Sequence, residues 1–114
     1  KPIFFFFFVI ILYKILILYS KEVSYSCDVF VVQYEEIAKM IRMRAVINVT
    51  RDSQKGIIIG KKGDGIKRLG IESRKDIEAF VGKKVFLELY VKVAKDWRND
   101  EKSLKEYGYL QKDE

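Results

Sequence analysis

The chain has 114 residues, a mass of 13.4 kDa, a formal net charge of +6 and an isoelectric point near 9.4. A chain of this length forms one domain. It contains no histidine and one cysteine, which excludes a histidine general base, an internal disulfide bond and a metal site built from several thiolates. These absences favour a binding module over an enzyme, and the basic charge is typical of a domain with a polyanionic partner.

Residues 3–19 are almost wholly apolar, and Lys14 is their only charged residue. A membrane-spanning helix needs about 20 apolar residues, so this segment is slightly too short. The five consecutive phenylalanines at 4–8 show no preference for one helix face. We predict a helix in the protein core. Two alternatives stay open, namely a membrane-associated segment and a start of the chain altered by a frame or translation error.

The pattern changes to an alternation of apolar and polar residues at Ser24. This period of two predicts a strand over residues 24–31, followed by a flexible polar connection at 35–39. A second strand is predicted over 41–50 and pairs with the first as a hairpin with a loop of several residues. Its buried face is expected to consist of Ile41, Met43, Ala45, Ile47 and Val49.

Two helices and a third strand are expected next. Asp52 and Ser53 can cap a short helix over 54–59, because their side-chain oxygens accept free N–H groups. A second helix is expected over 63–81, a strand over 85–93 and a last short helix over 99–108. The predicted fold class is α+β, with a three-stranded mixed sheet, helices packed on one of its faces and a short C-terminal helix.

The turn Gly60-Lys61-Lys62-Gly63 between the two central helices carries the clearest chemistry. Glycine has no Cβ, so a phosphate backbone can approach closely, and the following helix directs free N–H groups at it. The two lysines add positive charge, and Ile57–Ile59 offer an apolar wall for bases. Such a turn clamps about four nucleotides of a single strand. A phosphate-binding P-loop is rejected, because the spacing between Gly56 and Gly60 and the residue after Lys61 do not fit that motif.

Around this turn, residues 42–109 resemble the C-terminal KH domain of the Era family of bacterial GTPases. The resemblance rests on RDSQKG at 51–56, the GKKG turn, DWR at 96–98 and GY at 108–109. It implies a KH domain of the second topological type. It also implies binding of single-stranded RNA near the 3′ end of 16S ribosomal RNA, during assembly of the small ribosomal subunit. The family's GTPase domain precedes this region, so we expect a C-terminal fragment that binds RNA, lacks that enzyme activity and needs no cofactor.

The expected RNA-binding residues are those of the turn and its flanks. Lys67 and Arg68 lie one turn further along, and for them contact with phosphates and a solvated helix face both stay open. For Ile58 and Ile59 the groove and the core both stay open, and at least one of them is expected in the core. The full set is Ile58, Ile59, Gly60, Lys61, Lys62, Gly63, Lys67 and Arg68.

The resemblance divides the chain into an aberrant apolar segment at 1–13 and a KH domain with its tail at 14–114. At this position the family has an amphipathic helix with Glu and Arg on its solvent-exposed face, whereas this chain has Phe, Ile and Leu. We expect a monomer in the cytoplasm, with peripheral contact to the inner membrane as an alternative role of the apolar segment. Cys27 is expected to be buried and inert, and Trp97 to anchor the tail.

Overall fold

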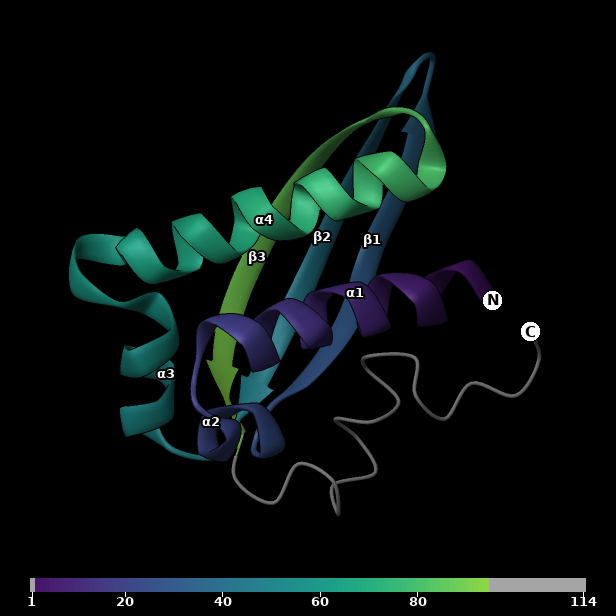
Figure 1. Ribbon diagram of the computed structural model, residues 1–114. Coiled ribbons are helices and arrows are strands. Elements are labelled where there is room, and N and C mark those ends of the chain that lie inside the picture. Colours follow the sequence, from purple (N-terminus) through teal and green to yellow (C-terminus); the bar gives the residue numbers. More distant parts are fainter. Residues whose placement is uncertain (1, 95–114) are drawn as a thin grey trace.

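The computed structural model describes residues 2–94, and its centre is a three-stranded sheet with helices in front of one face (Figure 1). Residues 61–63 form a short 3-10 turn between the helices Asp52–Ile59 and Asp64–Val81. The predicted helix over 99–108 and Trp97 lie outside the described residues. The elements are α1 (Pro2–Leu18), α2 (Lys21–Tyr25), β1 (Asp28–Ile37), β2 (Met40–Val49), α3 (Asp52–Ile59), α4 (Asp64–Val81) and β3 (Lys84–Val93).

The sheet is mixed, with β2 between the other two strands. β1 pairs with β2 in the antiparallel direction, as a hairpin requires, and β3 pairs with β2 in the parallel direction. A parallel pair needs a crossover, which α3 and α4 provide. The predicted α+β class and mixed sheet are confirmed.

One face of the sheet supplies much of the core. Every second residue of β2 lies on this face and is buried in the hydrophobic core. Partly buried apolar residues of β3 pack against the same core. The predicted buried face of β2 is confirmed, since Ile41, Met43, Ala45, Ile47 and Val49 are each at most 1% exposed.

The first strand begins and ends later than the sequence predicts. Residues 21–25 form α2, whose N-cap Ser20 accepts a hydrogen bond from the backbone N–H of Val23. β1 then runs to Ile37, so the predicted flexible connection at 35–39 is mostly strand and the hairpin turn is short. Opposite charges favour this extension, because Glu35 faces Arg42 across the ladder.

The apolar N-terminal segment is a helix whose inner face enters the core. Phe7, Ile11 and Ile15 repeat every four residues and are all 0% exposed. The helix α1 runs through the domain boundary predicted after residue 13. An ion pair of 3.1 Å between Lys14 Nζ and Asp76 Oδ2 links α1 to α4. The expectation of a core helix is confirmed.

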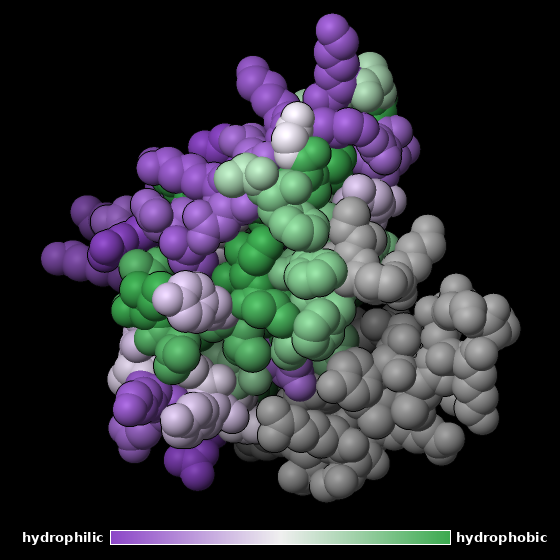
Figure 2. Space-filling model, turned by 45° about the vertical axis from the view of Figure 1, so that its right-hand side comes forward, coloured by the Kyte–Doolittle hydropathy of each residue, from purple (hydrophilic) through white to green (hydrophobic). Residues whose placement is uncertain are grey.

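The opposite face of α1 is apolar and exposed. Figure 2 shows hydrophobic side chains gathered over one part of the surface, with hydrophilic ones beside them. Within residues 2–94 no helix is long and apolar enough to cross a membrane. The exposed large apolar residues of this helix are Phe5, Phe6, Val9, Tyr13, Leu16 and Ile17.

Candidate nucleic-acid interface

The connection between α3 and α4 is a tight turn with three residues at positive φ. Gly60 has φ of 75°, Lys62 of 54° and Gly63 of 81°. Glycine reaches these angles without strain, whereas a residue with a Cβ rarely adopts them. The backbone conformation therefore explains why glycine stands at both ends of Gly60–Gly63.

The two helices meet closely just behind this turn. A Cβ added at Gly60 would lie 2.8 Å from the backbone nitrogen of Gly65. One added at Gly65 would lie 2.6 Å from the carbonyl oxygen of Ile58. By contrast, a Cβ at Gly63 would meet nothing within 4 Å. Gly60 and Gly65 thus serve helix packing, while the surface at Gly63 is open to a ligand.

The residue that follows α1 also contacts the end of α3, next to the turn. The hydroxyl of Tyr19, which directly follows α1, donates a hydrogen bond of 2.7 Å to the carbonyl oxygen of Ile58 at the end of α3. Burial raises the pKa of the Tyr19 hydroxyl, as does the nearby Cys27, while the positive charge of Arg68 acts in the opposite direction. The phenol thus keeps its proton as a donor.

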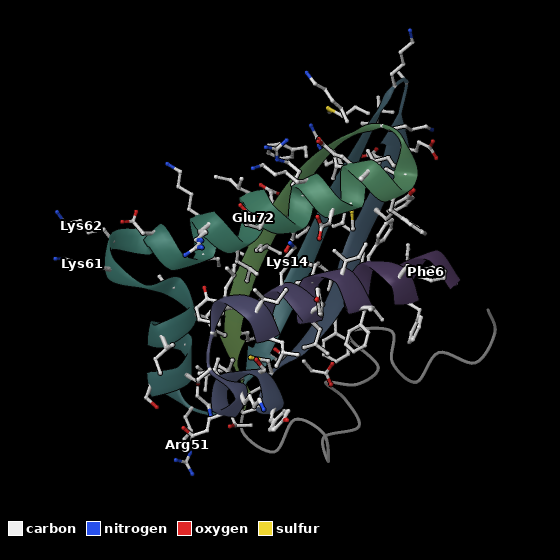
Figure 3. All side chains as sticks on the ribbon, in the orientation of Figure 1. Phe6, Lys14, Arg51, Lys61, Lys62 and Glu72 are labelled. Carbon is white, nitrogen blue, oxygen red and sulfur yellow. The ribbon has the colours of Figure 1, made fainter. Side chains whose placement is uncertain are left out.

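The tip of the turn carries concentrated positive charge. Lys61 and Lys62 are exposed, and Figure 3 shows both side chains directed away from the rest of the protein. Lys67 and Arg68 are also exposed, on the first turns of α4. Among residues 2–94 none of these four side chains has an ion-pair partner within 4.0 Å.

The start of α4 adds a partial positive charge to that of the lysines. Its N-cap is Gly63, whose backbone N–H donates to the carbonyl oxygen of Gly60, and the N–H of Asp64 donates to the carbonyl oxygen of Lys61. The helix dipole places partial positive charge at the same end. Asp64, in the first turn, is the nearest acidic residue along the chain. Together these groups form a surface suited to a phosphate backbone.

The apolar wall predicted at Ile57–Ile59 is only partly available. Ile58 is 0% exposed and belongs to the core cluster, so of the two positions open to it the structure shows the core, and its contact with bases is corrected. Ile57 is 52% exposed and Ile59 is intermediate. A helix points consecutive residues in different directions, so three successive isoleucines cannot share one face.

On the opposite face of the sheet, Arg44 is engaged within the protein. Its guanidinium forms an ion pair of 3.1 Å with Glu88 and lies 5.5 Å from the ring centre of Tyr90. Arg42, also on this face, is exposed.

Tyr19 and Gly65 are the parts of the site that sequence reasoning missed. Tyr19 is 39 residues from its acceptor in the chain, and no local spacing connects the two positions. Gly65 lies two residues after the last glycine of the motif, and a further glycine within a helical pattern is a signal of close packing.

A three-stranded mixed sheet, with two helices joined by a Gly-x-x-Gly turn, defines the KH class of domain. Residues 22–98 match the family model described as KH domain, and the chain belongs to this family. The relatives that it matches include GTPases named Era. The chain is 49% identical over 98 residues to GTPase Era of Syntrophus aciditrophicus, and 50% identical over 97 residues to the chloroplastic GTPase ERA1 of Zea mays.

These matches involve most of this chain and a minor part of its relatives. They cover 84% of the chain but 32% of the Syntrophus protein and 23% of the Zea mays protein. A solved structure of a Tyr-to-Ala variant of Aquifex aeolicus Era, bound to GDP and AlF4−, aligns with a TM-score of 0.83 and 33% identity. It covers 96% of this chain and 37% of that one. The expected resemblance to the Era KH domain is confirmed.

A second solved structure gives the same similarity and contains RNA. It is Era in complex with MgGDPNP and nucleotides 1506–1542 of 16S ribosomal RNA. The TM-score is again 0.83 at 33% identity, over 96% of this chain and 37% of that chain.

Proposed function

We propose that the chain binds single-stranded RNA through the turn Gly60–Gly63, and that its target is the 3′ region of 16S ribosomal RNA during assembly of the small ribosomal subunit. The observation that carries this proposal is the exposed pair Lys61 and Lys62 on a tight glycine turn at the start of α4. The relative crystallised with nucleotides 1506–1542 of 16S ribosomal RNA supports the choice of target.

The geometry suggests how the strand would be held. A phosphate can approach Gly63 closely, since nothing occupies the space where a Cβ would be. The partial positive charge at the start of α4 would attract its oxygens, and the ammonium groups of Lys61 and Lys62 would bind them. Lys67 and Arg68 would extend the positive surface along the helix, and Ile57 and Ile59 would contact bases.

The proposed role is binding without catalysis. The chain spans about a third of the length of its curated relatives, and the part that it matches is a KH domain. A domain of this kind would act as the RNA-holding part of a larger assembly factor, as a monomer in the cytoplasm.

The direct test reverses the charge of the turn. We expect the double variant Lys61→Asp with Lys62→Asp to lose at least tenfold in affinity for a fluorescent RNA with the sequence of nucleotides 1506–1542. The reason is that two phosphate-binding cations become two repelling anions. Fluorescence anisotropy measures the binding, and circular dichroism checks that the fold is intact.

A matched control changes charge elsewhere by the same amount. Lys39 and Lys84 are exposed and lie at the hairpin end of the sheet, where Lys84 pairs with Met40. Lys39→Asp with Lys84→Asp should reduce affinity much less. Equal losses in the two double variants would show that net charge alone attracts the RNA and would contradict the proposal.

A further inference from the structure

The hydroxyl of Tyr19 hydrogen-bonds a carbonyl oxygen at the end of α3 that the helix itself does not satisfy. Ile58 lies in the last turn of α3, where carbonyl oxygens have no partner four residues ahead within the helix. The backbone N–H of Gly60 bonds to Gly56 and that of Gly63 bonds to Gly60. The Tyr19 hydroxyl, at 2.7 Å, satisfies the Ile58 carbonyl from outside the helix.

The same hydroxyl lies at the crossing of α3 and α4. A Cβ built on Gly65 would be 2.6 Å from the Ile58 carbonyl oxygen and 3.1 Å from the Tyr19 hydroxyl. Three segments that are distant in sequence therefore converge at one point, which lies directly behind the turn Gly60–Gly63.

Tyr19 is itself held firmly by α1. Its backbone N–H donates to the carbonyl oxygen of Ile15 at 2.9 Å, continuing the helical pattern, and the side chain of Ile15 is 0% exposed. The ring thus connects a well-packed helix to the end of α3. A small displacement of α3 would break a well-formed bond to a partner that cannot easily follow.

We propose that Tyr19 is a positioning residue for RNA binding, which fixes the end of α3 and hence the geometry of the turn Gly60–Gly63 without touching RNA. This inference rests on the proposed function. A turn held in its binding conformation binds with its full affinity, whereas a turn that samples other conformations loses affinity in proportion to the competent fraction.

The test is Tyr19→Phe in the full chain, which removes one oxygen and keeps the ring. We expect the dissociation constant for the 1506–1542 RNA to rise roughly threefold or more as the competent fraction falls. The dependence of affinity on salt should keep its slope, because no phosphate contact is lost. Amide hydrogen exchange at Gly60, Gly63 and Gly65 should become faster.

The matched control is Tyr25→Phe, which makes the same chemical change on a side chain that is 73% exposed. It should leave affinity and exchange unchanged. All binding is measured well below the unfolding temperature of each variant, so that a loss of overall stability alone does not change the affinity.

Two results would overturn the inference. Wild-type affinity in Tyr19→Phe would mean that the hydrogen bond serves stability alone, and a shallower salt dependence would mean that the variant has lost a contact with the RNA itself. If the wild-type chain bound no RNA, the proposed function would fail and the role in RNA binding with it. Hydrogen exchange would then still show, independently, whether Tyr19 holds the turn.

Discussion

At the scale of single residues, the glycines of the candidate site have different tasks. Gly65 allows α3 and α4 to touch, since a Cβ there would lie 2.6 Å from a backbone oxygen. Gly56 lies in α3, and a Cβ added there would meet nothing within 4 Å. The same substitution should therefore have opposite effects at these two positions.

We predict that Gly65→Ala lowers the free energy of unfolding by about 1–3 kcal/mol, because backbone atoms must move apart. Gly56→Ala should raise it by about 0.5–1 kcal/mol, because alanine loses less conformational entropy in a helix. Urea denaturation of the two variants beside the wild type measures both. A stabilising Gly65→Ala would contradict the close contact of the helices.

Cys27 provides a residue-scale prediction about pH. It is 4% exposed, and its Sγ donates to the carbonyl oxygen of Val23 at 3.0 Å. Burial, with a smaller effect of the Asp28 carboxylate, raises the pKa of the thiol from 9.0 to about 11. The folded chain thus favours the protonated form, while the unfolded chain ionises near the ordinary value.

The contribution of this thiol to stability is complete below the unfolded-state pKa and is lost as the pH rises towards the folded-state value. We predict that the wild type loses more stability than Cys27→Ala between about pH 8 and about pH 10.5. Urea denaturation at the two pH values measures the difference, in which effects shared by both proteins, such as the ionisation of tyrosines other than Tyr19, cancel. Equal losses of stability in the two proteins would show that burial does not protect the Cys27 thiol from ionisation.

At the scale of elements, α1 shows what a sequence pattern can and cannot predict. A run of five phenylalanines has no periodicity, so the inner face could not be chosen from the sequence. In the structure only Phe7 of the five is fully buried, and it aligns with Ile11 and Ile15 against the sheet. Helix geometry, and not residue type, distributes these side chains between core and surface.

This packing predicts unequal effects along one helix. Ile11→Ala should lower the free energy of unfolding by about 2–5 kcal/mol, because it leaves a cavity in the core. Ile17→Ala, at a position that is 54% exposed, should cost less than about 1 kcal/mol. Thermal and urea unfolding measure both. Similar small losses would show that the N-terminal half of α1 does not belong to the core.

The strands and the turn were predictable to different degrees. Strict alternation in β2 and β3 fixed their positions and buried faces, and the spacing of Gly60 and Gly63 located the turn. The start of β1 was not predictable, because α2 contains valine and tyrosine that fit an alternating pattern equally well. The bond between Tyr19 and Ile58 depends on tertiary packing, which no local pattern encodes.

At the scale of the whole molecule, RNA affinity should depend on salt concentration in different ways if the net charge of +6 attracts the RNA or if a local cluster of cations binds it. A diffuse attraction would involve many charges over the surface. A clamp on about four nucleotides neutralises only three or four phosphates, and each contributes about −0.7 to the slope of log affinity against log salt for a single strand. We predict a slope of roughly −2 to −3.

Titrating one RNA at several salt concentrations measures this slope. The double variant Lys61→Asp with Lys62→Asp should reduce its magnitude, while the control at Lys39 and Lys84 should leave it almost unchanged. A much steeper slope, equal in all three proteins, would indicate general attraction and not a defined site.

The proposed binding of 16S ribosomal RNA is tested most directly by comparing two RNA sequences. Fluorescence anisotropy should compare the 1506–1542 sequence of 16S ribosomal RNA with a scrambled copy at the same salt concentration. The account predicts clearly tighter binding of the true sequence, because base contacts add to the phosphate clamp. No binding of either RNA by a folded sample would contradict the proposed function, and equal binding of both would contradict the proposed target.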